Sequence, residues 1–217
     1  MQKGQKILTG VLWGLTVLAM MSVIGAGLYR RQRDRDAAGY ELPVTDNPVA
    51  KLDVIAPAPR FDLIDQNNQP LSLDSLKGHP FVADFVYTRC PGPCPIMTGK
   101  MASLQNSIGD ARVHFLTVSV DPTYDQPAVL KAYAKTHNAD ESRWHFATGK
   151  EDAVFATARG MLIPAMPASE TTPIVHSEKF ILVDASGNIR GYYNSKDEVD
   201  VEKLVADAKT LAAEPAK

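Results

Sequence analysis

Residues 81–95, FVADFVYTRCPGPCP, run from an apolar segment into a pair of cysteines. These are the only two cysteines in the 217-residue chain. The segment Phe81–Thr88 reads as a buried strand, and the prolines after it favour a turn and then the first turn of a helix. Cys90 and Cys94 therefore lie where a strand leads into a helix. The positive end of a helix dipole lowers thiol pKa and favours thiolate, the form that attacks disulfides and binds soft metals. The pair predicts redox chemistry or a metal site.

The spacing of the two cysteines is compatible with several roles. Three residues separate Cys90 from Cys94, so on a helix they would share a face, close enough for a disulfide or for joint binding of one ion. Pro91 and Pro93 stiffen the loop and bias Gly92 away from helical angles, so ideal helical geometry is not assured. An inert disulfide staple is the alternative, but closing so short a loop removes little chain entropy.

Apolar periodicity predicts strands alternating with helices on either side of this pair. The further expected strands are Val113–Val120, Trp144–Ala147, Ile174–Val183 and Ile189–Tyr193, and the expected helices are Pro95–Ile108, Pro127–His137, Glu151–Arg159 and Glu198–Ala212. Residues 61–65 and 71–73 flank a turn-rich link and predict an N-terminal β-hairpin. A parallel first half, an antiparallel second half and a thiol pair after a strand describe an α/β, thioredoxin-like mixed sheet flanked by helices.

The N-terminal part predicts a membrane anchor followed by a tether. Residues 7–29 carry no charge, and as a helix they would span about 34 Å, enough to cross a bilayer. A cleaved signal peptide is the alternative; its apolar region is usually shorter, so we favour a transmembrane helix within residues 1–29. Residues 30–59 are polar and proline-punctuated, which suits a flexible tether, and residues 60–217 are expected to form the domain. A strict count of flanking Lys and Arg would place the domain in the cytoplasm, but long domains translocate largely regardless of that count.

Composition excludes one class of partner. The formal net charge is −2 and the pI is about 6.2, so the chain lacks the basic excess typical of nucleic-acid binding. Hydrophobic residues make up 45% and charged residues 22% of the chain, which is ordinary for a folded domain. We therefore expect no nucleic-acid partner.

A metal site would need at least one ligand besides the two thiols, and histidine suits that role. The candidates are His79, His114, His137, His145 and His176. The first four lie in loop, helix-end or apolar-strand contexts, which predict solvated or locally hydrogen-bonded rings. His176 stands early in a strand that, in a thioredoxin-like fold, passes close to the thiols. From the residues alone, a satisfied strand histidine remains the simpler interpretation of His176.

Three motifs, in order, resemble the SCO/SenC family. They are TRCPGPCP at residues 88–95, VDPTYDQP at residues 120–127, and His176 ahead of Leu182-Val183-Asp184 and Gly187. The resemblance implies a membrane-tethered, thioredoxin-like copper protein that helps to metallate the dinuclear copper centre of cytochrome c oxidase. It implies Cys90, Cys94 and His176 as copper ligands and the copper-bearing oxidase subunit as partner. It also implies a single-pass protein of the bacterial inner membrane facing the periplasm, with the mitochondrial inner membrane as the less favoured location.

The chemistry of these residue types agrees with what the resemblance implies. Thiolates are soft donors that select Cu(I), imidazole accepts both copper oxidation states, and three ligands leave room for handover. Structural zinc sites prefer four protein ligands. Met97, Met161 or Met166 could add a weak contact, although filling gaps in the core is the commoner role of methionine. Asp121 is expected to cap a turn, with a contact beside the metal as the alternative.

Three functions remain open from the sequence. A copper-binding assembly factor needs His176 as much as the thiols, whereas a thiol:disulfide oxidoreductase needs only Cys90 and Cys94 as a redox-active pair. A thiol peroxidase would depend on one dominant thiol, which a close pair fits less well. We favour the copper-binding factor, so an enzymatic activity is not required.

Overall fold

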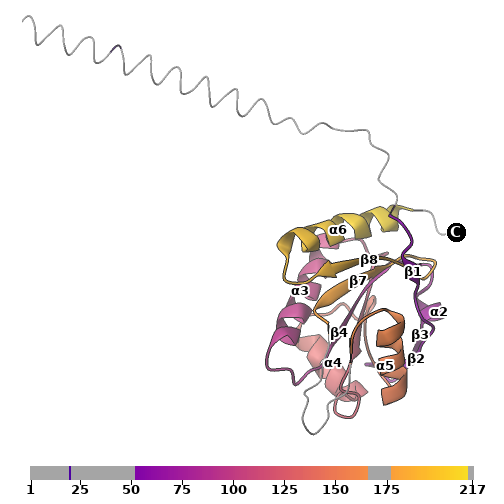
Figure 1. The fold of residues 1–217 in the computed structure, drawn as a ribbon. Coiled ribbons are helices and arrows are strands. Elements are labelled where there is room, and N and C mark those ends of the chain that lie inside the picture. Colours follow the sequence, from indigo (N-terminus) through magenta and orange to yellow (C-terminus); the bar gives the residue numbers. More distant parts are fainter. Residues whose placement is uncertain (1–19, 21–51, 166–176, 215–217) are drawn as a thin grey trace, which may run out of the picture. The chain divides into compact units, whose positions relative to one another are not determined.

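The computed structural model describes Met20 and residues 52–165 and 177–214, whose fold is drawn in Figure 1. The chain divides into two units, Met1–Ala50 and Lys51–Lys217, and the fold below is that of the second. Within the described ranges, no helix is both long and apolar enough to cross a membrane. The predicted transmembrane helix lies, apart from Met20, outside the described residues, as do His176 and the tether up to residue 51.

One eight-stranded sheet, with helices against both faces, makes up the described part of the domain. The strands are β1 Ala56–Pro57, β2 Asp62–Asp65, β3 Pro70–Ser72, β4 Phe81–Val86, β5 His114–Ser119, β6 Trp144–Thr148, β7 Lys179–Val183 and β8 Asn188–Asn194. The helices are α2 Leu73–Leu76, α3 Pro93–Ile108, α4 Pro127–Thr136, α5 Glu151–Gly160 and α6 Glu198–Ala213. The strand and helix order follows the prediction closely.

The sheet is mixed, with its strands in the order β1-β8-β7-β4-β5-β6-β2-β3. Strands β4, β5 and β6 run parallel, while β7 pairs antiparallel with both β4 and β8. The β2–β3 hairpin adds to the sheet through an antiparallel pairing of β2 with β6. The predicted mixed sheet and N-terminal β-hairpin are therefore confirmed.

Strand β4 lies at the centre and divides the interior into two cores. Successive side chains of a strand point to opposite faces, so Phe81 and Phe85 enter one core and Val82 and Val86 enter the other. The first core is covered by α5 and α2, and the second by α3, α4 and α6. By the same alternation, Asp84 faces the second core, the one that contains α3.

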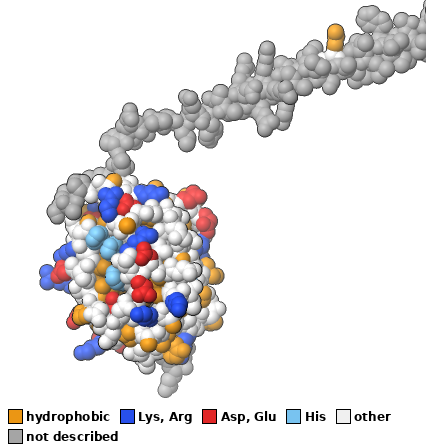
Figure 2. All heavy atoms as spheres, turned by 180° about the vertical axis from the view of Figure 1, so that it is seen from behind, with side chains coloured by type: hydrophobic (Ala, Val, Ile, Leu, Met, Phe, Trp, Pro, Cys, Tyr) orange, Lys and Arg blue, Asp and Glu red, His pale blue; other side chains and the backbone are white. Residues whose placement is uncertain are grey.

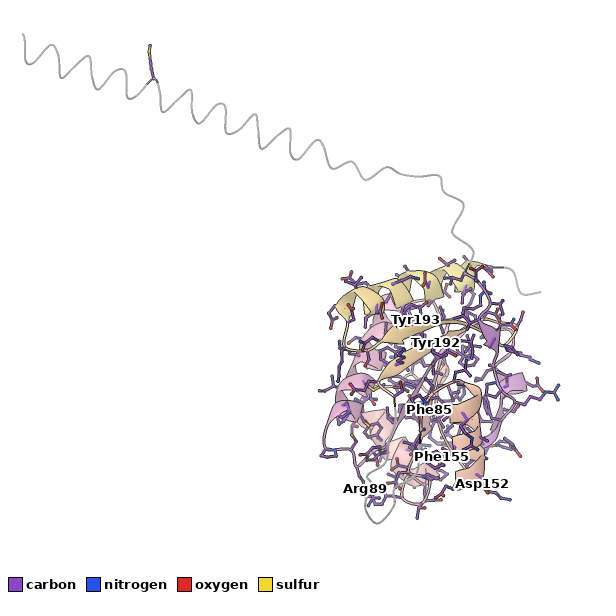
Figure 3. The ribbon with its side chains drawn as sticks, viewed as in Figure 1. Phe85, Arg89, Asp152, Phe155, Tyr192 and Tyr193 are labelled. Carbon is purple, nitrogen blue, oxygen red and sulfur yellow. The ribbon has the colours of Figure 1, made fainter. Side chains whose placement is uncertain are left out.

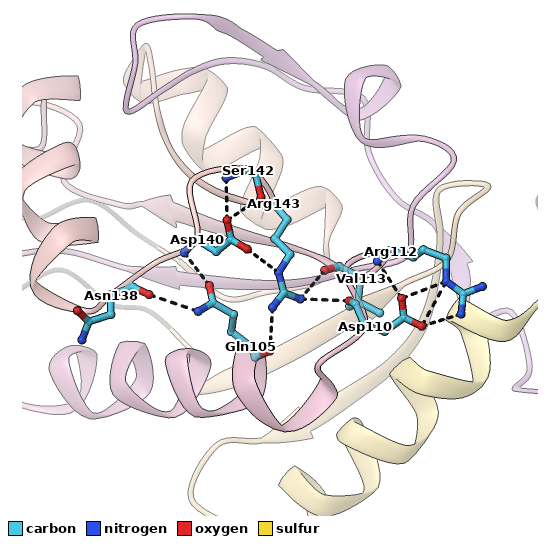
Figure 4. A network of polar contacts seen from close by, with 8 residues as sticks. All are labelled: Gln105, Asp110, Arg112, Val113, Asn138, Asp140, Ser142 and Arg143. Carbon is cyan, nitrogen blue, oxygen red and sulfur yellow. Dashed lines mark hydrogen bonds and ion pairs between the residues drawn. The ribbon is translucent and has the colours of Figure 1, made fainter.

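The rear end of α3 is fixed by a polar network shown in Figure 4. The Arg143 guanidinium donates to the Gln105 carbonyl at 2.9 Å and to the Asp110 carbonyl at 3.1 Å. The Gln105 side chain in turn accepts a hydrogen bond from the Asp140 backbone N–H at 2.8 Å. The two carbonyls also accept backbone N–H groups, Gln105 from Gly109 and Asp110 from Val113, so the guanidinium adds a second hydrogen bond to each. These bonds hold the helix, and with it the cysteine at its front end, in register with the sheet.

Two short elements were not expected from the sequence. Strand β1 pairs antiparallel with β8, with Ala56 opposite Ile189, so the folded part begins before Arg60 and includes residues predicted to be tether. Helix α2 occupies residues 73–76, where the second arm of the hairpin was expected to end. Ser72 and Ser75 form a reciprocal capping box at its start, because each hydroxyl accepts a hydrogen bond from the other residue's backbone N–H.

Candidate metal and redox site

The thiol loop, which we define as residues 87–92, joins β4 to α3. The Cys90 backbone N–H donates to the Tyr87 carbonyl at 3.2 Å, which closes a turn at the end of the strand. Helix α3 begins at Pro93 rather than at the predicted Pro95; both prolines suit the first turn, where a missing N–H loses no hydrogen bond. Cys94 therefore lies in the first turn of α3 and Cys90 in the loop before it.

Both cysteines are thiols, and both are buried. Cys90 is 6% exposed and Cys94 is fully buried, within the core that also contains Met97. Their side chains are joined by a hydrogen bond. The structure thus brings together the two cysteines predicted to act as a pair.

The two thiols differ in how readily they ionise. Burial raises the pKa of Cys94 well above its ordinary value, and the hydrogen bond with Cys90 raises it further. Burial also raises the pKa of Cys90, but hydrogen bonds from Cys94, the Gly92 backbone and the Tyr87 side chain outweigh burial, so the pKa of Cys90 is lowered overall. A hydrogen bond to a thiolate favours the charged form. Cys90 is therefore the thiol that ionises first and the stronger nucleophile at neutral pH.

A second loop, residues 121–125, holds the thiol loop in place through a buried carboxylate. Asp125 is fully buried, and it accepts hydrogen bonds from the Thr88 backbone N–H at 3.0 Å and from the Thr88 hydroxyl at 2.5 Å. The Ser119 hydroxyl donates to the same carboxylate at 2.5 Å. Asp125 thus connects the end of β5 to the residue two positions before Cys90.

The same two loops meet again at the surface through Arg89. Its guanidinium donates to the Asp121 carboxylate at 2.6 Å and lies 4.1 Å from the centre of the Tyr124 ring. Figure 3 shows Arg89 at the edge of the domain beyond Phe85 of β4. Asp121 therefore contacts the thiol loop through Arg89. Among the described residues, the recorded partner of its carboxylate is this guanidinium and not a cysteine sulfur.

The other histidines lie away from the thiols. His79 precedes β4 and stacks on His114 with ring centroids 4.1 Å apart, and His145 lies 6.3 Å from His114. Figure 2 shows histidine side chains gathered on one face of the domain. His137 packs beside Tyr133 with centroids 4.6 Å apart. The Nδ1 atom of His79 lies 3.2 Å from the Arg112 carbonyl, as expected for a locally hydrogen-bonded ring. The prediction is wrong for His114 and His145, because the Nδ1 atom of each is buried without a hydrogen-bond partner among the described residues.

The His79–His114–His145 group should make stability depend on pH. Burial, together with the neighbouring His79 and His145, lowers the pKa of His114 from 6.5 to about 4. The unfolded chain therefore takes up a proton before the folded protein does, so stability is complete above pH 6.5 and falls as the pH drops toward 4. We expect His114→Phe, which keeps the stack but cannot be protonated, to reduce this loss.

Urea unfolding midpoints at several pH values between 7 and 4 would measure the effect. His137→Phe is the comparison, because burial alone lowers the pKa of His137, and we expect this variant to reduce the loss less than His114→Phe does. A pH dependence that is as steep in His114→Phe as in the unchanged protein would contradict the assignment.

The methionine candidates divide by position. Met97 and Met161 are buried, at 1% and 0% exposure, in the two cores. They fill the core, as expected for the commoner role of methionine. Met166, like His176, lies outside the described residues.

Three residues of the site were missed from the sequence. Tyr87 hydrogen-bonds to Cys90, Asp125 anchors the thiol loop, and Asp84 is a carboxylate buried beneath α3. The only available signals were their positions: a charged residue inside an apolar strand, a tyrosine at its end, and a second aspartate in the 120–127 motif.

Comparison with known proteins identifies the family. The SCO1/SenC family model matches residues 52–213, which is most of the chain. The chain belongs to the SCO1/SenC family. A SCO1 protein homolog of Bacillus subtilis is 32% identical over 157 residues, covering 70% of this chain and 81% of the relative. The sequence resemblance is thereby confirmed.

Solved structures of Sco proteins share the fold. One is BsSco, described as a member of the Sco family of cytochrome c oxidase assembly proteins with a disulfide switch; it matches with a TM-score of 0.67 and 28% identity over 75% of this chain and 98% of its own. Another is ScoI of Bradyrhizobium japonicum with copper bound, with a TM-score of 0.61 and 26% identity over 72% of this chain and 99% of its own. These similarities support the thioredoxin-like architecture of the domain.

Proposed function

We propose that this Sco-family chain binds copper at the thiol loop and acts in the assembly of cytochrome c oxidase. Its cargo would be delivered to the dinuclear copper site of the oxidase, or its thiols would prepare the cysteines of that site. The observation that carries the proposal is the buried, hydrogen-bonded pair Cys90 and Cys94. A Sco protein of the same fold has been solved with copper bound, which supports copper as the ion.

The donors present fit copper better than zinc. Two thiolates are soft ligands that select Cu(I). Among the described residues, no group of three or more His, Cys, Asp or Glu side chains is arranged to hold a metal. Zinc in structural sites prefers four protein ligands, whereas the sequence offers three obvious donors, Cys90, Cys94 and His176. A third ligand besides the two thiols would complete a copper site.

We propose His176 as that third ligand. Strand β7 runs antiparallel to β4, with Val183 opposite Phe81 and Ile181 opposite Ala83. The chain therefore enters β7 at the end of the sheet where β4 leads into the thiol loop. His176 directly precedes the described residue Ser177 on this approach. This direction of entry supports a site made of Cys90, Cys94 and His176.

We also propose that the domain is held at a membrane. Residues 1–29 would form a single-pass anchor and the residues up to β1 a tether, so that the domain faces the periplasm of a bacterial inner membrane. Such an arrangement would place the thiol loop where it can reach the copper-bearing subunit of the oxidase. The uncharged run at residues 7–29 supports the anchor.

A thiol:disulfide oxidoreductase is the second candidate function. The opposite pKa shifts of the two thiols favour it, because Cys90 can attack a partner disulfide while Cys94 stays protonated until it resolves the mixed disulfide. The disulfide switch described for BsSco also supports redox chemistry in this family. This activity needs no histidine.

Anaerobic Cu(I) competition titrations on the full chain in detergent would separate the two functions. Losing a group that merely supports a ligand costs about 10- to 100-fold in metal affinity, so we expect Cys90→Ala and His176→Ala to lose at least as much. His79→Ala is the control, because His79 lies at the opposite end of β4 from the thiol loop and should leave affinity unchanged.

The titrations have two outcomes that oppose the proposal. Unchanged affinity in His176→Ala would remove histidine ligation and favour the oxidoreductase. Equal affinity in the unchanged protein and in Cys90→Ala would show that the thiol loop does not hold copper at all.

A further inference from the structure

Tyr87 is hydrogen-bonded to both thiols of the pair. Its side chain hydrogen-bonds to Cys90, and its backbone bonds to Cys94. Its carbonyl also accepts the Cys90 backbone N–H at 3.2 Å. One residue at the end of β4 thus contacts each sulfur separately, with its ring on one and its backbone on the other.

We propose that Tyr87 is a positioning residue that holds the thiol pair in its dithiol form and opposes closure of the Cys90–Cys94 disulfide. This proposal rests on the proposed copper-binding function, because the dithiol is the form of the pair that can accept copper. It assigns to Tyr87 control over which of the two states, dithiol or disulfide, the protein occupies at a given redox potential.

The ring of Tyr87 is held in place by packing on two sides. It is partly buried against both cores, the one beneath α5 and the one beneath α3. Movement of the phenol with the sulfur would disturb both. The packing therefore keeps the phenol in place beside Cys90.

Disulfide closure would break this hydrogen bond. The two sulfurs must approach to about 2.05 Å with a defined dihedral angle, which draws Cys90 away from the phenol. A sulfur within a disulfide is also a weaker acceptor than a thiolate or thiol sulfur. The hydrogen bond from Tyr87 therefore stabilises the reduced pair and contributes nothing comparable to the oxidised pair.

The redox step involved is an exchange with a disulfide partner. One thiolate of the pair attacks a sulfur of glutathione disulfide and releases the first glutathione. The second thiol then attacks the mixed disulfide, which forms the Cys90–Cys94 bond and releases the second glutathione. Two electrons pass from the protein to the glutathione disulfide, and the two protons of the protein thiols end on the two glutathione molecules.

The test is the equilibrium between dithiol and disulfide in metal-free full-length protein, measured in glutathione buffers by alkylation and mass spectrometry. A net hydrogen bond is commonly worth a few-fold to about tenfold in an equilibrium constant. We expect Tyr87→Phe to favour the disulfide by roughly 3- to 10-fold, which lowers the reduction potential by about 15–30 mV at 29.6 mV per tenfold.

Tyr133→Phe is the matched control. It also removes one partly buried phenol at the core beneath α3, but that hydroxyl is hydrogen-bonded to Thr98 at 3.0 Å. Its equilibrium constant should equal that of the unchanged protein. Tyr87→Phe keeps the ring that fills the space between the cores, so a folded variant is expected, and near-ultraviolet circular dichroism would verify it.

Two results would overturn the proposal: an unchanged or more reducible pair in Tyr87→Phe, or an equal shift in Tyr133→Phe. The dithiol–disulfide equilibrium is measured without metal, so its result would remain valid even if the protein did not bind copper. Conversely, a protein that binds copper as proposed could still show no effect of Tyr87→Phe, and then only this inference would be lost.

Discussion

Asp84→Asn should make the protein more stable at pH 8 by about 2–4 kcal/mol. Asp84 is fully buried in the central strand β4, and neither carboxylate oxygen has a hydrogen-bond partner of ordinary length. Burial raises its pKa from 3.8 to about 7, and the nearby Thr117 hydroxyl offsets only part of that rise. At 1.36 kcal/mol per pKa unit this corresponds to roughly 4 kcal/mol, and the asparagine amide returns some of it because it also lacks partners.

The pH dependence follows from the direction of the shift. Because the folded-state pKa of Asp84 lies above the unfolded value, the folded protein keeps this proton longer than the unfolded chain does. The cost of Asp84 is therefore absent below about pH 3.8, increases between pH 3.8 and 7, and is complete above pH 7. The advantage of Asp84→Asn should appear over that window.

Urea unfolding at pH 5 and pH 8 would measure the advantage of Asp84→Asn. Asp74→Asn is the control, because the Asp74 carboxylate is exposed and pairs with Lys77 at the surface. It should change stability little at either pH. Equal stability of Asp84→Asn and the unchanged protein at pH 8 would show that the buried carboxylate carries no penalty.

A destabilising carboxylate in the central strand is consistent with a functional site. Its negative charge is among the causes that raise the pKa of Cys94, so it helps to keep that thiol protonated while Cys90 ionises. Proteins commonly give up stability where a site needs an unfavourable group. Asp84→Asn should accordingly reduce the difference between the two thiols.

The sequence was sufficient for the order of strands and helices because that order depends on local patterns. The apolar run of residues 81–86 and the proline at the start of α4 are visible in the chain itself. It was insufficient for β1, whose two residues become a strand only by pairing with β8, more than 130 residues away. The start of α3 was also misplaced, since any of three nearby prolines suits a first turn.

The proximity of the two thiols was predictable from the sequence, and the contacts around them were not. Cys90 and Cys94 are four positions apart, and the family motifs include both. The contacts that hold them depend on tertiary structure: Thr88 meets Asp125 across 37 positions, and Tyr87 reaches both sulfurs through its place at a strand end. His176 remains a prediction, supported by the direction in which the chain enters β7.

Asp125→Ala should cost about 3–5 kcal/mol of stability and loosen the thiol loop. The fully buried carboxylate accepts three hydrogen bonds, two from Thr88 and one from Ser119. Hydrogen bonds to a charged group are worth about 1.5–3 kcal/mol each and are not additive. Removing the acceptor leaves the Thr88 N–H and two hydroxyls without their partner in a buried place, which is the costly direction of such a change.

Asp121→Ala separates this effect from a general disturbance of the same loop. Asp121 is itself buried, but its ion-pair partner Arg89 has a side chain that is 56% exposed. Water can therefore solvate the guanidinium when the carboxylate is removed, so we expect the loss to be close to the roughly 0–1 kcal/mol typical of exposed pairs. We expect urea unfolding to show a large loss for Asp125→Ala and a small one for Asp121→Ala. Cys90 should also react with iodoacetamide about tenfold faster or more in Asp125→Ala, because opening of a loop with less local stability exposes a buried thiol more often. Equal losses and equal alkylation rates in the two variants would mean that the buried carboxylate does not anchor the thiol loop, and that the position of Cys90 is set by β4 and α3 alone.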